Sequence, residues 1–72
     1  MKKTFKLTDL GCANCAAKME HKIKKIKGVS DATVSFLMQK LTIEASPDDF
    51  ERILEESAKI CKKIEPDCVI KR

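Results

Sequence analysis

Aromatic side chains are scarce in this sequence, which has no tryptophan and no tyrosine. Its only three aromatic residues, Phe5, Phe36 and Phe50, stand in apolar-face positions of their segments. Proteins that bind single-stranded nucleic acid usually present exposed aromatic rings on which bases stack. We therefore expect no nucleic-acid partner, although the chain carries a net charge of +4.

Long apolar runs are also missing. No stretch approaches the roughly 20 residues that span a bilayer, so residues 1–72 are not expected to insert into a membrane. The basic N-terminus lacks the apolar segment of a signal peptide. The four cysteines have neither regular spacing nor an export signal beside them. We expect a reducing, cytoplasmic location, either for a free protein or for the cytosolic portion of a membrane protein.

Catalytic patterns are absent too. We find no Ser-His-Asp set, no paired-carboxylate site and no glycine-rich phosphate loop, and glycine occurs only twice. A chain of 72 residues forms one small domain, here residues 1–72, close to the lower limit for a single core. The sequence therefore predicts a binding module and no enzyme by itself.

Hydrophobic periodicity predicts the secondary structure. Alternation favours strands over 4–8, 32–36 and 41–44, the last two as a hairpin. Helical spacing predicts a first helix over 13–27, ended by Gly28. For the second helix we expect Ser46 as the N-cap and Pro47 at the first position, with an apolar face made by Phe50, Ile53, Leu54, Ser57, Cys61 and Ile64.

The second helix is expected to end at Pro66, and residues 68–72 to form a short last strand. The order is then β-α-β-β-α-β, made of two split β-α-β halves. This order predicts an α+β, ferredoxin-like fold in which two helices cover one face of a four-stranded antiparallel sheet.

The chemistry of the chain is concentrated between Asp9 and Glu20. Cys12 and Cys15, separated by two residues, stand where the first strand gives way to the first helix. Unpaired N–H groups and the positive end of the helix dipole favour thiolate over thiol at such a position. Thiolates either bind soft metals or exchange disulfides, so both functions are open on this evidence alone.

The run Gly-Cys-Ala-Asn-Cys-Ala-Ala-Lys-Met-Glu, followed by Lys-Gly-Val-Ser-Asp-Ala-Thr-Val-Ser-Phe and Gln-Lys-Leu-Thr-Ile-Glu, resembles the heavy-metal-associated domain over essentially the whole chain. That family includes copper chaperones and the N-terminal domains of heavy-metal P-type ATPases. The resemblance implies that Cys12 and Cys15 are metal ligands for one heavy-metal ion and that Gly11 allows the loop its tight approach.

The resemblance also bears on the metal. Copper members usually have Gly-Met-x before the first cysteine of the motif, whereas Asp9-Leu10-Gly11 stands here, with Leu10 expected to take over the packing role of the methionine. The run Cys-Ala-Asn-Cys-Ala-Ala-Lys is more similar to the N-terminal domains of zinc, cadmium and lead exporting ATPases. We therefore favour zinc, cadmium or lead, with a freestanding copper(I) chaperone as the alternative.

Two thiolates suffice for copper(I), but zinc and cadmium normally take four donors. A divalent ion therefore needs a further ligand, and the sequence offers two candidates. Asp9 is close along the chain, and Cys68 opens the last strand, which this fold places beside the first.

The remaining sulfur and imidazole side chains are expected to be structural. Cys61 falls on the apolar face of the second helix, and His21 points away from the apolar stripe of the first. Met19 and Met38 are predicted to be packing or hairpin residues. A dithiol redox protein would need a longer chain and a proline facing the cysteine pair, and a closed zinc site of four cysteines conflicts with the apolar position of Cys61.

Lysines give the first helix a basic outer face. Residues 1–44 hold nine basic against four acidic side chains, and Lys18, Lys22 and Lys25 follow one another at helical spacing. We expect this face either to be a solvated surface or to dock an acidic partner. The partner implied is a metal-donor or metal-acceptor domain, or the remainder of the same ATPase.

Overall fold

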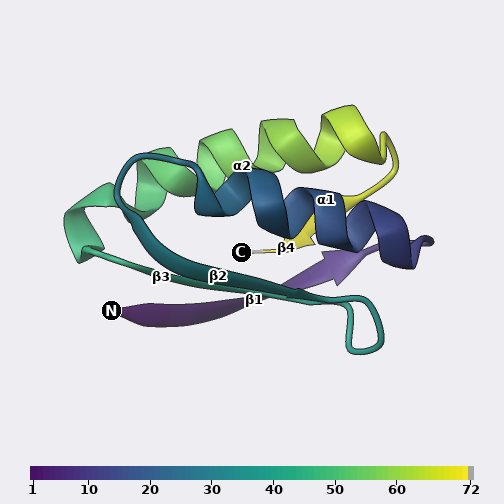
Figure 1. Cartoon of the computed structure of the whole chain (residues 1–72), viewed down its shortest axis with the longest axis horizontal. Coiled ribbons are helices and arrows are strands. Elements are labelled where there is room, and N and C mark those ends of the chain that lie inside the picture. The colour runs from purple at the N-terminus through teal and green to yellow at the C-terminus, as the bar shows by residue number, and fades with distance from the viewer. Residues whose placement is uncertain (72) are drawn as a thin grey trace.

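The computed structural model describes residues 1–71, and Figure 1 shows two helices lying over one face of a sheet. Both helices cross the sheet on the same side. The elements, in chain order, are β1 (Lys2–Thr8), α1 (Ala13–Lys24), β2 (Val29–Ser35), β3 (Lys40–Ala45), a 3₁₀ turn (Pro47–Asp49), α2 (Phe50–Ile64) and β4 (Val69–Lys71).

The four strands pair in the order β2-β3-β1-β4, and every pairing is antiparallel. Phe5 of β1 lies opposite Leu41 of β3, and Leu7 of β1 lies opposite Ile70 of β4. Apolar side chains therefore meet on the face that the helices cover, while the other face is polar. This is the ferredoxin-like α+β fold that the sequence predicts.

One core fills the space between the sheet and the helices. Met19 and Ile23 of α1 and Ile53 of α2 are fully buried, because their helical spacing puts them on the faces turned toward the sheet. The buried apolar residues are Leu7, Leu10, Ala16, Met19, Ile23, Ala32, Val34, Leu41, Ile43, Ala45, Phe50, Ile53, Leu54, Cys61, Cys68 and Ile70.

Two helix boundaries differ from the sequence-based prediction. The first helix ends at Lys24, three residues early, because Lys25 and Ile26 bond to the carbonyls three residues before them and tighten the chain into a turn. Gly28, at φ +99°, completes that turn. Ser46 makes no side-chain capping bond; the Pro47–Asp49 turn intervenes and α2 begins at Phe50. Of the last predicted strand, Arg72 lies outside the described residues.

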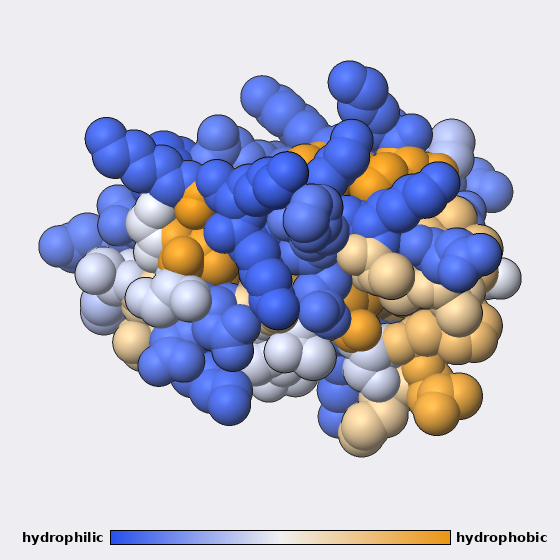
Figure 2. Space-filling model, viewed as in Figure 1, coloured by the Kyte–Doolittle hydropathy of each residue, from blue (hydrophilic) through white to orange (hydrophobic). Residues whose placement is uncertain are grey.

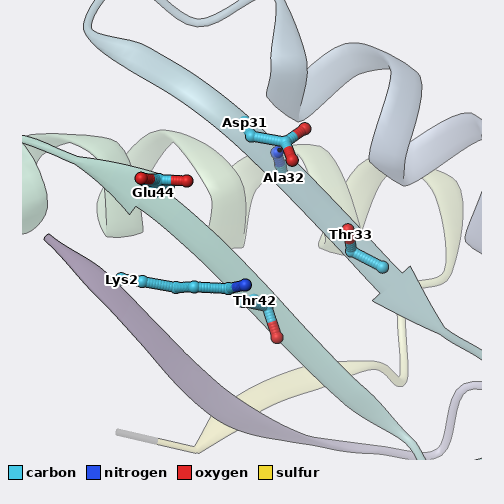
Figure 3. A pocket seen from close by; sticks show the side chains of 6 residues that line it. All are labelled: Lys2, Asp31, Ala32, Thr33, Thr42 and Glu44. Carbon is cyan, nitrogen blue, oxygen red and sulfur yellow. Dashed lines mark hydrogen bonds between the residues drawn. The ribbon is translucent and has the colours of Figure 1, made fainter.

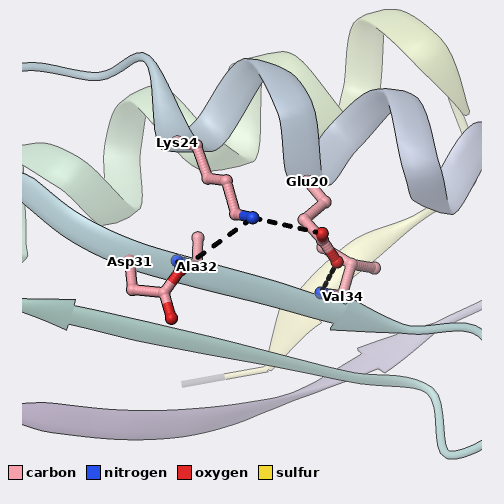
Figure 4. A network of polar contacts seen from close by, with 5 residues as sticks. All are labelled: Glu20, Lys24, Asp31, Ala32 and Val34. Carbon is pink, nitrogen blue, oxygen red and sulfur yellow. Dashed lines mark hydrogen bonds and ion pairs between the residues drawn. The ribbon is translucent and has the colours of Figure 1, made fainter.

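Glu20 attaches α1 to the outer edge of the sheet. Its carboxylate accepts the backbone N–H of Val34 at 3.0 Å, which occupies a donor on the free edge of β2. Lys24 lies 3.6 Å from Glu20 and 3.9 Å from Asp31, so one ammonium group joins the helix to the strand at two carboxylates (Figure 4). The contact fixes how α1 sits across the sheet.

The face of the sheet away from the helices carries polar side chains. Thr4 and Thr42 share a hydrogen bond of 3.1 Å across β1 and β3. Lys6 has like charges opposite it on both sides, Lys40 on β3 and Lys71 on β4. Such pairs weaken a sheet slightly.

No helix among the described residues has the length and apolar character needed to span a bilayer.

Ser57 is the one buried hydroxyl that finds no hydrogen-bond partner among the described side chains. It lies on α2, completely buried in the core. We predict that Ser57→Ala raises the free energy of unfolding by about 1 kcal/mol, because an unsatisfied buried hydroxyl is removed and alanine favours the helix. Ser46→Ala, at an exposed serine without a capping bond, should change it by less than about 0.5 kcal/mol. Urea unfolding of both variants measures the difference, and a Ser57→Ala protein less stable than its parent would contradict the prediction.

Candidate metal site

Cys12 is the N-cap of α1. Its backbone is extended (φ −145°, ψ 124°), and its carbonyl accepts the N–H of Ala16 at 3.0 Å. Its sulfur accepts the N–H of Cys15 at 3.4 Å, the bond that a serine or aspartate oxygen usually accepts at this position. The first turn of α1 contains no acidic side chain. The Cys12 sulfur therefore has no acidic side chain in that turn competing with it for the positive end of the helix dipole.

The two cysteines of the pair differ in acidity. The backbone N–H of Cys15, and after it the Cys15 thiol, stabilise the Cys12 thiolate and lower the pKa of Cys12 below its ordinary value of 9.0. The pKa of Cys15 is raised to about 11, first because its thiol is engaged with Cys12 and then by desolvation. Cys12 therefore ionises first, and the Cys15 thiol donates to it until a second proton leaves.

Glu65 is a neighbour of the cysteine pair that the sequence analysis did not name. It follows the last residue of α2, where its N–H donates to the carbonyl of Cys61 at 2.7 Å. Its carboxylate lies near enough to the pair to raise the pKa of both Cys12 and Cys15. The ends of β1 and α2 lie at the same end of the molecule (Figure 1). This arrangement brings the Glu65 carboxylate near the two thiols.

The signal for Glu65 was present in the sequence. The prediction that the last strand runs antiparallel beside the first already implies that the segment before it reaches the loop that carries Cys12. Glu65, directly before Pro66, lies in that segment. The sequence analysis named only Asp9 and Cys68 as candidates for a further ligand.

The two third-ligand candidates from the sequence lie differently. Asp9 is exposed in a left-handed turn at φ 58°. Cys68 is buried, and its thiol is close enough to that of Cys61 for each to influence the pKa of the other. Burial, followed by the charge of Glu65, raises the pKa of Cys68. Within residues 1–71, no three His, Cys, Asp or Glu side chains are already arranged around a single metal position.

The side chains expected to be structural lie as predicted. Cys61 is in the core, and burial raises the pKa of its thiol to about 12. Met19 and Leu10 are buried, Leu10 in the segment between β1 and α1. His21 and Met38 are exposed, Met38 in the turn between β2 and β3.

A second group of charged residues lies far from the cysteine pair. Lys2, Asp31 and Glu44 border a hollow of about 190 Å³ on the sheet (Figure 3). They stand at the start of β1, the start of β2 and the end of β3, which is the end of the sheet opposite the Cys12 loop. This hollow is therefore separate from the cysteine pair.

Comparison with known proteins settles the family. The profile of the heavy-metal-associated domain matches residues 4–68, nearly the whole chain. The chain is a heavy-metal-associated domain. As in that family generally, it is a metal-binding module, and catalysis belongs to the larger ATPases in which such domains occur.

The relatives of this heavy-metal-associated domain include metal-transporting ATPases. The chain is 31% identical over 72 residues to a cadmium, zinc and cobalt-transporting ATPase of Bacillus subtilis, covering all of this chain and 10% of that protein. It is 42% identical over 53 residues to a probable cadmium-transporting ATPase of Listeria monocytogenes, covering 71% of this chain and 8% of that protein. The chain thus spans a tenth or less of these curated relatives.

A solved structure extends the comparison. The N-terminal domain of a potential copper-translocating P-type ATPase from Bacillus subtilis, in its Cu(I)-loaded state, superimposes with a TM-score of 0.74 at 28% identity. The match covers 97% of this chain and 82% of that one. Relatives of both the cadmium and the copper type therefore share this fold.

The difference in acidity between the two cysteines gives a prediction for the metal-free domain. Iodoacetamide should alkylate Cys12 first, and the rate should reach its plateau at a pH below that of an ordinary thiol, because a lowered pKa populates the thiolate at lower pH. Cys15 and Cys61 should react later, since their pKa values are raised to about 11 and about 12. Peptide mapping by mass spectrometry across pH 5–10 measures the order, and faster alkylation of Cys15 would refute it.

Proposed function

We propose that this domain binds one zinc, cadmium or lead ion through Cys12 and Cys15 and passes it to a metal-acceptor domain, as the cytosolic N-terminal part of a transport ATPase. The observation that carries the proposal is the thiol pair at the N-terminus of α1, where Cys12 Sγ accepts the N–H of Cys15 at 3.4 Å. The dipole and these N–H groups offset the negative charge of thiolates before any ion arrives. The donors are soft, as heavy-metal ions prefer.

Glu65 supports the choice of a divalent ion. Two thiolates satisfy copper(I), whereas zinc and cadmium take further donors and accept carboxylate oxygen among them. The Glu65 carboxylate is close enough to Cys15 to raise the pKa of that thiol. We infer that it completes a three-donor protein site, ahead of Asp9 and Cys68, and that water or an incoming ligand takes the remaining position.

Copper(I) delivery is the second candidate function. It is favoured by the likeness to the Cu(I)-loaded domain of Bacillus subtilis and by the sufficiency of two thiolates for that ion. The two candidates differ in whether a carboxylate is needed. Loss of the Glu65 oxygen should weaken a zinc or cadmium complex and leave a two-coordinate copper(I) complex nearly unchanged.

Cadmium titration of single-site variants tests the ligand set. Cys12→Ser combined with Cys15→Ser should abolish stoichiometric binding while the circular dichroism of the folded domain is retained. Glu65→Gln should weaken cadmium binding about tenfold or more and move the ¹¹³Cd resonance, since loss of even an outer-shell partner costs 10–100-fold in other metal sites. Asp9→Asn and Cys68→Ala are the matched controls. Tight cadmium binding by the double-serine variant would exclude Cys12 and Cys15 as the ligands. If the ¹¹³Cd resonance is unchanged in Glu65→Gln but shifts in one of the two controls, the residue changed in that control is the third ligand.

Metal delivery is proposed to use the basic face of α1. Lys18 and Lys22 are exposed on α1 and Lys25 directly after its end, and Figure 2 shows hydrophilic side chains over most of the helical face. An acidic partner held there would lie next to the ion. A site with few protein donors leaves room for an incoming thiolate, so transfer can proceed by ligand exchange.

Charge reversal tests the docking face. Changing Lys18, Lys22 and Lys25 to Glu should slow metal transfer to the partner about tenfold at low salt and leave the affinity for the ion nearly unchanged, because rim charges act mainly on association rate. The control reverses Lys6, Lys40 and Lys71, which lie on the open face of the sheet and alter the net charge equally. Equal transfer rates for the two variants, measured by stopped flow at low ionic strength, would show that α1 has no specific docking role.

A further inference from the structure

Gln39 joins the turn between β2 and β3 to the loop that carries Cys12. Its side-chain oxygen accepts the N–H of Leu10 at 3.0 Å, and its side-chain nitrogen donates to the carbonyl of Leu10 at 2.7 Å. The same nitrogen donates to the carbonyl of Phe36 at 2.8 Å. One carboxamide therefore satisfies both backbone groups of a residue 29 positions away and also closes its own turn.

These bonds replace a missing strand partner. The backbone pairing of β1 with the turn ends where the N–H of Leu7 donates to the carbonyl of Gln39 at 2.7 Å. Leu10 lies beyond that point, in a segment with no regular secondary structure, and its side chain is buried. Buried backbone groups need partners, and the Gln39 amide presents a donor and an acceptor side by side as a strand would.

The backbone conformation of Gln39 is unfavourable for glutamine, so its side-chain hydrogen bonds must offset a cost. Gln39 has φ 53°, in the left-handed region where glycine is favoured and asparagine is tolerated. On backbone grounds alone glutamine is a poor residue for this turn. The three hydrogen bonds of its carboxamide offset that cost, and neither substitute would make them, since glycine has no side chain and asparagine is shorter by one methylene.

We infer that Gln39 is a positioning residue for the metal loop. Resting on the proposed function, the inference is that the Gln39 carboxamide fixes Leu10 and thereby holds Cys12, two residues further on, at the N-cap of α1. The loop is then fixed at Leu10 by Gln39 and at Cys12 by the N–H of Cys15. A neutral amide suits this place, because a carboxylate would repel the two carbonyls that it faces and could not donate to them.

Two substitutions and a matched control test the inference. Gln39→Gly suits the positive φ but removes all three side-chain bonds, and Gln39→Glu keeps an acceptor for the N–H of Leu10 while losing both donated bonds. Ser35→Ala is the control, since it removes a bond of the same turn, from the N–H of Met38 to the Ser35 hydroxyl at 3.2 Å, without touching Leu10. All three are compared with the parent in urea unfolding, so that general destabilisation is measured separately.

Hydrogen exchange of the Leu10 amide and cadmium affinity are the two readouts. In the metal-free domain, both Gln39 variants should speed exchange at Leu10 at least tenfold relative to the parent and to Ser35→Ala. In the loaded domain, both should lower cadmium affinity about tenfold and speed release to a chelator, as outer-shell changes do at other metal sites.

The outcomes separate this inference from the proposed function. A parent that binds no cadmium would refute the proposed function and the metal-site role of Gln39 with it. Tight binding by the parent and equal affinity in Gln39→Gly would overturn the inference alone, as would unchanged exchange at Leu10. An equal loss of affinity in Ser35→Ala would also overturn it, because the turn as a whole, and no single carboxamide, would then support the loop.

Discussion

The antiparallel pairing of β1 with both β3 and β4 is the constraint on which the rest of this domain depends. Because β1 lies inside the sheet, the residue that ends it is flanked on one side by the turn that begins β3 and on the other by the segment that leads into β4. Three segments distant in sequence therefore meet at one end of the molecule: the loop with Cys12, the turn with Gln39 and the end of α2 with Glu65. The site is assembled by strand register.

Two opposing electrostatic effects act on the cysteine pair at that end of the molecule. The start of α1 supplies N–H groups and no carboxylate, which lowers the pKa of Cys12, while Glu65 opposes ionisation of the pair. A bound cation would remove that opposition by lying between the three negative groups. Two thiolates and one carboxylate bind more weakly than a closed cage of four thiolates, and exchange with an incoming ligand is correspondingly easier. In the function that we propose, this balance suits metal delivery better than a structural role.

Rigidity in the remainder of the domain supports this open site. The core is a single cluster between the sheet and the helices, and Glu20 holds α1 to the edge of β2. The sequence also tolerates small costs away from the site: Ser57 is buried without a partner, and Lys6 faces Lys40 and Lys71 across the sheet. A small domain has little stability to spare, so these positions offer room for stabilising changes that leave the metal loop untouched.

The sequence by itself determined the element order, the face of each strand and helix that is buried, and the position of the Cys12–Cys15 pair at a helix start. These features follow from local periodicity and spacing, which act over a few residues. Prediction from the sequence was less accurate where local signals compete. Gly28 suggested a longer first helix, and Ser46 suggested a cap that the Pro47–Asp49 turn displaces. Only the tertiary structure decided that Glu65 faces the thiol pair and that Gln39 bonds the backbone of Leu10, because both contacts join segments brought together by strand pairing and neither leaves a periodic pattern in the chain.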